Sequence, residues 1–150
     1  MRLEVQREIE ASSATVWSVL TAWERQPEWM VDARAVHVLT PLREGPGVTI
    51  RCPTNLLGFT VQDVMRVTAW EPPRRLAVEH LGRVITGHGA FELEDRGTDR
   101  CHVRWWEEVI PPLGRLGEWG ASRVALPVFE RIFARSLDRL AGLAEAPRPA

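Results

Sequence analysis

The chain has 150 residues and a mass of 17.0 kDa, the size of a single domain with a substantial core. Its hydrophobic fraction of 45%, charged fraction of 26% and net charge of −1 are typical of a soluble globular protein, and its scattered arginines argue against a nucleic-acid-binding face. The apolar runs are too short to cross a bilayer and no signal peptide is visible, so a cytoplasmic protein is expected.

The segment from Ile9 to Trp29 is the most informative part of the sequence. A strand ending at Ile9 leads into Ser12 and Ser13, which are good N-cap residues for a short helix. The helix places Val16, Trp17 and Leu20 on one face, followed by Trp23. Pro27 then interrupts the helix, so a second short turn presents Trp29.

Period-two alternation follows for about eighty residues and predicts six further strands. We expect them at 34–40, 46–53, 58–70, 75–81, 84–94 and 100–110. From Leu113 the pattern becomes helical, with an apolar stripe at Leu116, Trp119, Leu126, Phe129, Phe133, Leu137 and Leu140. The final helix should begin near Gly114 and bend near Arg123, because Pro127 cannot donate a backbone hydrogen bond.

The segment A-S-S-A-T-V-W-S-V-L-T-A-W-E-R-Q-P-E-W (11–29) resembles the opening of START-like (SRPBCC) domains, in particular the polyketide cyclase/dehydrase branch. The resemblance continues more weakly to about Leu143. It implies an α+β helix-grip fold, in which a seven-stranded antiparallel sheet with two short helices after its first strand wraps a long C-terminal helix. The domain would span residues 1–144, and residues 145–150 would form a disordered tail.

The hairpin turns predict which side chains share a face of the sheet. If the turns centre on 70–75, 81–84 and 95–99, Glu107 faces Gly87, which faces Val78, which faces Val67. The flanking rows are Trp105, Gly89, Leu76, Ala69 and Val109, Ile85, His80, Met65. This mostly apolar face should meet the long helix, while the opposite face, facing water, carries Arg66, Glu79, His88, Glu92, Arg104 and Glu108.

The face toward the helix has features that suggest a ligand cavity. Gly87 and Gly89 leave room at its centre, and Glu107, His80 and Asp63 are titratable groups in otherwise apolar surroundings. Each has an alternative, since Glu107 could point outward at a bulge, His80 could be solvated near its turn, and the start of the strand carrying Asp63 is poorly fixed. The proposed ligand-binding residues are Trp29, Met65, Val67, Val78, Gly87, Gly89, Trp105, Trp119 and Arg123.

Some of the proposed ligand-binding residues could instead have purely structural roles. The three tryptophans are either packing residues or part of the cavity wall, and Arg123 is either a surface arginine or a partner for an anionic ligand. By the register above, Glu107 and His80 are two strands apart, too far for a direct hydrogen bond but able to reach one ligand between them.

Other chemistries are poorly supported. All 19 basic residues are arginine and there is no tyrosine, which excludes Schiff-base catalysis by lysine and proton transfer by tyrosine. The four histidines lack metal-ligand spacing, no nucleotide-binding motif or serine-nucleophile setting is present, and we expect no metal or cofactor. Cys52 and Cys101 are better explained as buried free thiols than as a disulfide.

The resemblance implies binding of a hydrophobic, oxygenated, polyketide- or lipid-like molecule between sheet and helix. If the protein is an enzyme, aldol-type cyclisation or dehydration is expected, with Glu107 or Asp63 as base and His80 as acid or orienting group. The missing tyrosine weakens a full transfer of the family's catalytic machinery. The alternatives are a non-catalytic carrier or sensor and an assembly-docking factor, the latter disfavoured by the mixed charges on the outer face.

Overall fold

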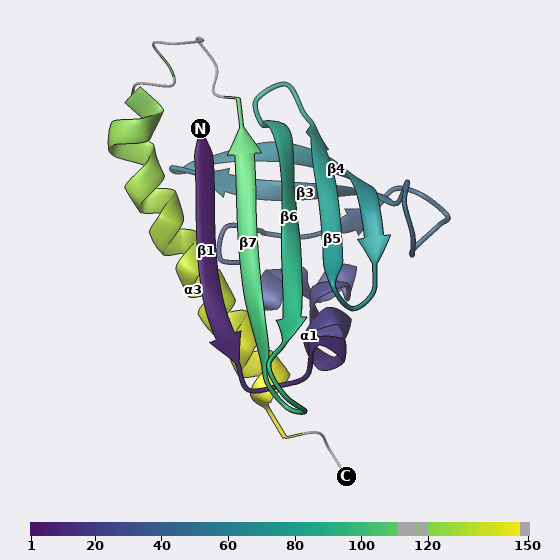
Figure 1. Ribbon diagram of the computed structural model, residues 1–150. Helices are drawn as coiled ribbons and strands as arrows, with labels where there is room; N and C mark the ends of the chain where they lie inside the picture. The colour runs from purple at the N-terminus through teal and green to yellow at the C-terminus, as the bar shows by residue number, and fades with distance from the viewer. Residues whose placement is uncertain (111–116, 118–119, 148–150) are drawn as a thin grey trace.

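The computed structural model describes residues 1–110, 117 and 120–147, and its strands form one antiparallel sheet in the order β1-β7-β6-β5-β4-β3-β2 (Figure 1). The strands are β1 (Arg2–Ile9), β2 (His37–Val38), β3 (Thr49–Leu56), β4 (Phe59–Glu71), β5 (Arg75–Leu81), β6 (Thr86–Asp95) and β7 (Cys101–Val109). The helices are α1 (Ser13–Leu20), the 3₁₀-helix η1 (Trp23–Glu28), the π-helix η2 (Ala121–Ala125) and α3 (Leu126–Glu145). The predicted helix-grip fold with seven antiparallel strands is confirmed.

The N-terminal segment folds as the sequence predicts as far as Leu20. Helix α1 ends there, and Pro27 lies inside the 3₁₀-helix η1, so it does not interrupt the first helix as expected. Ser12 caps α1 by accepting a hydrogen bond from the backbone N–H of Thr15 at 3.2 Å. Ser13 has a different role, because its backbone N–H and hydroxyl both donate to the carboxylate of Asp95 at the end of β6. This contact fixes α1 against the sheet, with Val16 and Leu20 fully buried.

Two strands differ most from their expected bounds, while the ends of β4, β6 and β7 differ by one or two residues. β3 begins at Thr49, three residues later than predicted, because Gly45 and Gly47 adopt positive φ angles in the preceding turn. β2 contains only His37 and Val38 instead of the expected seven residues. β5 spans 75–81 as expected.

The pairing of β6 with both neighbours is displaced by two residues from the predicted register. Glu107 faces Gly89, not Gly87, and Gly89 in turn faces Val78. Both hairpin loops are centred one residue later along the chain than expected, since Leu81 pairs with Thr86 and Asp95 with Cys101. A displacement by two residues preserves the face on which each side chain lies, so the expected concave face is retained.

A bulge in β4 is a second departure from the expected register. Pairing shifts between Val67 and Ala69, so Leu76 faces Trp70 where Ala69 was expected. The Trp70 ring packs edge-on against Trp17 at 5.2 Å between centroids. The bulge therefore brings a large aromatic side chain into the contact between the sheet and α1.

The C-terminal helix is irregular where the sequence predicts a bend. The five residues of η2 include Arg123 and immediately precede α3, which carries Pro127 in its first turn. The predicted helix start near Gly114, and the stripe positions Leu116 and Trp119, lie outside the described residues. The helix ends at Glu145, which the expected tail had included, and residues 148–150 also lie outside the described part.

The outer face of the sheet carries the charged ladder that alternation predicts. The guanidinium of Arg66 is 3.0 Å from Glu79, that of Arg104 is 2.9 Å from Glu4, and the imidazole of His88 is 3.2 Å from Glu108. Cys52 and Cys101 are buried free thiols, as expected. No helix in the described part of the chain has the length and hydropathy needed to cross a membrane.

Candidate functional site

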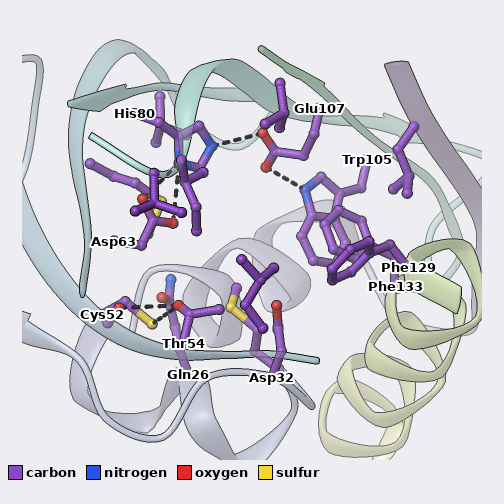
Figure 2. A pocket seen from close by; sticks show the side chains of 18 of the residues that line it. Gln26, Asp32, Cys52, Thr54, Asp63, His80, Trp105, Glu107, Phe129 and Phe133 are labelled. Atoms are coloured by element: carbon purple, nitrogen blue, oxygen red, sulfur yellow. Dashed lines mark hydrogen bonds and ion pairs between the residues drawn. The ribbon is translucent and has the colours of Figure 1, made fainter. Parts of the chain in front are cut away.

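A cavity of about 450 Å³ lies between the concave face of the sheet and the helices η1 and α3 (Figure 2). Its wall is mostly apolar and includes Met65, Val78 and Trp105 from the sheet and Phe129 and Phe133 from α3. The cavity volume is within the range of roughly 300–1,000 Å³ that is usual for small-molecule sites. The expectation of an apolar pocket between sheet and helix therefore agrees with the structure.

Three buried polar side chains form a continuous hydrogen-bonded chain on the sheet side of this cavity. His80 of β5 lies between Asp63 of β4 and Glu107 of β7 (Figure 2). Its Nδ1 is 2.9 Å from Asp63 Oδ1, and its Nε2 is 2.9 Å from Glu107 Oε2. Since both carboxylates accept, both ring nitrogens carry hydrogen when both bonds form, and His80 is then a charged imidazolium.

The direct contact between His80 and Glu107 corrects the expectation that they were too far apart. They are two strands apart, but the intervening strand β6 presents Gly89 opposite Glu107. A Cβ atom at Gly89 would lie only 2.0 Å from Glu107 Oε2. The Glu107 side chain therefore lies across β6 over the glycine backbone and reaches His80.

The surroundings of His80 raise its pKa to about 10. Burial is the largest single influence and lowers the pKa, but the hydrogen bonds and negative charges of Asp63 and Glu107 together outweigh it. The indole Nε1 of Trp105 donates to Glu107 Oε1 at 3.1 Å, so both oxygens of this carboxylate are oriented. Among the described residues, no group of three or more His, Cys, Asp or Glu side chains has the geometry of a metal site.

Asp32 is a polar cavity residue that the sequence analysis missed. It lies on the wall opposite His80, near Thr54 and Gln26 (Figure 2). Its Oδ1 is buried without a hydrogen-bond partner. Burial, as the largest cause, and the charges of Asp63 and Glu107 raise the pKa of Asp32 to about 6, although its own backbone N–H acts in the opposite direction. Its position depends on contacts with β3, and no local pattern in the sequence predicts those contacts.

The predicted ligand-binding residues divide into two groups. Met65, Val78 and Trp105 line the cavity, while Val67 is buried beside it without lining it. Gly89 acts indirectly by leaving space for Glu107.

The other four predicted ligand-binding residues do not line the cavity as described. Trp29 is fully buried and packs edge-on against Phe91 and Trp105, because η1 turns its ring into the core. Gly87 faces backbone, since a Cβ there would lie 1.9 Å from the carbonyl oxygen of Glu108. Arg123 is exposed on η2, and Trp119 lies outside the described residues.

Comparisons with solved structures agree with this architecture. An aromatase/cyclase from Streptomyces sp. R1128 (ZhuI) superposes with a TM-score of 0.82 at 18% identity, covering 97% of this chain and 93% of the other. A protein from Thermus thermophilus gives 0.81 at 14% identity, with 96% and 97% covered. A START superfamily protein from Mycobacterium smegmatis gives 0.69 at 16% identity, with 96% and 94% covered. At these identities the likeness establishes the fold alone.

A search of curated proteins finds no match to the sequence. A family model does match, over residues 1–145, and its description is polyketide cyclase/dehydrase and lipid transport. The match includes every described strand and the helix α3, and therefore both walls of the cavity. The chain belongs to this polyketide cyclase/dehydrase and lipid-transport family of START-like domains.

Proposed function

We propose that this protein binds a hydrophobic, oxygenated, polyketide- or lipid-like molecule in the cavity and catalyses an aldol-type cyclisation with dehydration. The observation that carries the proposal is the chain of Asp63, His80 and Glu107, buried in a wall that is otherwise mainly apolar. Buried titratable groups that converge on a ligand-sized cavity are typical of acid–base sites. The family description and the likeness to an aromatase/cyclase are consistent with this reaction class.

The proposed reaction removes two protons from one carbon and delivers two to one oxygen. Glu107 would remove the first proton from a carbon next to a ligand carbonyl, and the resulting enolate carbon would form a bond to a second carbonyl carbon. The alkoxide formed there would take up a proton. Loss of the second proton from the attacking carbon and departure of the hydroxyl group, protonated to water, would then form the carbon–carbon double bond. Imidazolium His80, hydrogen-bonded to Glu107 Oε2, would stabilise the charges and return the proton.

A non-catalytic carrier or sensor is the second candidate function. Its support is the complete pairing of the polar chain, because both ring nitrogens of His80 and both oxygens of Glu107 already have partners. A proton transfer to the ligand must first break one of these bonds. A rigid binding wall has no such requirement.

Replacing Glu107 by Gln distinguishes the two candidates. A linear 1,3,5,7-tetraketone is a suitable probe, since its C2 carbanion can attack C7 and loss of one water then gives an aromatic ring that is followed by absorbance. For an enzyme, Glu107→Gln should retain affinity within a few-fold and lower turnover at least ~10²-fold. Glu108→Gln, on the outer face, is the matched control and should retain turnover.

A carrier would give a different set of results. The unmodified protein would bind the tetraketone without accelerating its cyclisation, and Glu107→Gln would have no turnover to lower. Native mass spectrometry of the purified protein measures binding independently. A protein that binds neither the tetraketone nor any other apolar molecule would contradict both candidate functions.

A further inference from the structure

The loop between η1 and β2 holds Asp32 in a fixed position on the cavity wall. The backbone carbonyl of Asp32 accepts from the N–H of Asn55 in β3 at 2.8 Å, and its neighbour Ala33 forms a β-bridge with Thr54. On the other side, the N–H of Val31 donates to the Ser136 hydroxyl of α3 at 3.0 Å. The backbone on either side of Asp32 is therefore held against both the sheet and the helix.

An unpartnered carboxyl oxygen in this position requires an explanation. Oδ1 of Asp32 is buried without a hydrogen-bond partner, and the side chain lines the cavity. Leaving a buried acceptor unsatisfied is unfavourable, and more so for a charged group. A ligand that donates to the Asp32 carboxyl group would offset this cost.

The charges around the cavity restrict what that ligand can be. The described lining residues include three carboxyl groups, those of Asp32, Asp63 and Glu107. His80 is the one lining side chain among them that carries a positive charge, and it is already paired with two carboxylates. The N-terminal ammonium of Met1, another lining residue, donates to the carbonyl of Val109. A carboxylate-ended ligand would therefore bring a further negative charge into a mostly apolar site without a free cationic side chain on the described wall.

We propose that Asp32 receives the polar end of the ligand, and that this end is a hydrogen-bond donor, a hydroxyl or a protonated amine, and not a carboxylate. The inference rests on the proposed ligand-binding function and specifies its substrate class. A hydroxyl or ammonium group donates to the carboxyl group of Asp32, while the rest of the molecule lies against the apolar wall formed by side chains such as Phe129 and Phe133.

Three molecules with the same alkyl chain test the inference by isothermal titration calorimetry at pH 7.5. These are 1-decylamine, 1-decanol and decanoate, which are respectively cationic, neutral and anionic at this pH. We expect the amine and the alcohol to bind at least about tenfold more tightly than decanoate, because each can donate a hydrogen bond to an ionised carboxylate and decanoate cannot. Decanoate binding as tightly as decylamine would overturn the inference while leaving the binding function intact.

Variants identify the responsible carboxyl group. Asp32→Asn has nearly the same shape and should reduce the preference for decylamine over decanoate by about tenfold or more. Asp99→Asn makes the same chemical change in an exposed loop and should leave that preference unchanged. An unchanged preference in Asp32→Asn would also overturn the inference.

A test on the unmodified protein avoids any effect of a substitution on folding. The titratable groups around Asp32 are Asp63, Glu107, His80 and Cys52, of which His80 and Cys52 have pKa values raised to about 10 and 11. Lowering the pH from 7.5 to 5 should protonate Asp32 and weaken decylamine binding several-fold without weakening that of decanol. Affinities that do not diverge with pH would contradict the role of Asp32, whereas failure of all three molecules to bind would reject the proposed function as well.

Discussion

His80 is held by a carboxylate at each of its two ring nitrogens. Each ring nitrogen is 2.9 Å from a carboxylate oxygen, and all three side chains are buried. In the folded protein the imidazolium is thus favoured far above the usual pKa of histidine, whereas in the unfolded chain that partnership is lost. The stability of the protein must consequently depend on pH through this residue.

The direction of this dependence follows from the raised pKa. Because the folded-state pKa is about 10 and the unfolded value is about 6.5, the stabilisation is fully present below pH 6.5 and is lost as the pH rises toward 10. Urea denaturation at pH 7, 8 and 9 should show a falling free energy of unfolding, by at most about 1.4 kcal/mol per pH unit from this group.

A comparison of variants isolates the contribution of His80. Cys52 and Cys101, with pKa values raised to about 11 by burial, also disfavour folding at alkaline pH, but they do so equally in all variants. His80→Gln should therefore show a shallower decline than the unmodified protein. The control His88→Gln, on the outer face, should keep the steep decline, and equal slopes in all three proteins would contradict the assignment.

Residue by residue, the sequence was sufficient to place Asp63, His80 and Glu107 on one face but not to bring them into contact. Alternation along strands determines the face, and it survives the two-residue displacement of β6. The contact depends on which glycine lies opposite Glu107, and the length of the hairpin loop determines this. The loop length predicted from sequence is uncertain by at least the two residues that separate Gly87 from Gly89. Asp32 could not be found in this way, because a contact between distant segments positions it.

At the scale of the strand, the two glycines of β6 have different tasks. Gly87 has a φ of 138° and faces the backbone of Glu108, whereas Gly89 faces the movable carboxylate of Glu107. Gly87→Ala should destabilise the fold by about 2 kcal/mol or more, since neither the backbone conformation nor its neighbour can adjust cheaply. This replaces the expectation that Gly87 leaves room at the centre of the face toward the helix.

Gly89→Ala should instead preserve the fold and displace the Glu107 side chain. Because His80 would lose one of its two carboxylate partners, its pKa should fall relative to the unmodified protein, as measured by NMR titration of the imidazole. An unchanged His80 pKa in a folded Gly89→Ala protein would show that Glu107 reaches His80 without needing the space over Gly89.

At the scale of the helix, Pro127 is less costly than its sequence context suggests. An interior helical proline costs about 3 kcal/mol, but Pro127 stands in the first turn of α3, directly after the π-helix η2. Pro127→Ala should therefore change the free energy of unfolding by less than about 1 kcal/mol in thermal or urea denaturation. A gain approaching 3 kcal/mol would mean that the proline strains a continuous helix.

Over the whole molecule, α3 has two halves with different support. Its buried residues all lie from Ser136 onward, while Phe129 and Phe133 in the first half line the cavity. In the first half Phe133 stacks on Trp105, and a bound ligand would add further contacts there. Amide hydrogen exchange in peptides covering 126–133 should slow when decanol is added, and exchange in 136–145 should stay nearly constant. Uniform slowing along the helix would indicate global stabilisation instead.

The whole fold was more predictable than its cavity. The capped helix around Ser12 and the long alternating region each carry local signals for their elements, and their order leaves few ways to arrange an antiparallel sheet. The cavity arises from distances between elements, such as the separation of α3 from the sheet. Periodicity in the sequence contains no measure of that separation.

The space over Gly89 also has a consequence for how this sequence can diverge. A side chain at position 89 and the carboxylate of Glu107 would occupy the same volume. A substitution of Gly89 alone is therefore penalised while Glu107 remains paired with His80. Related chains that keep the carboxylate should keep glycine at the facing position. Those that have lost the carboxylate are free to place any strand-forming residue there, so the two sites should co-vary as a pair across an alignment of homologues.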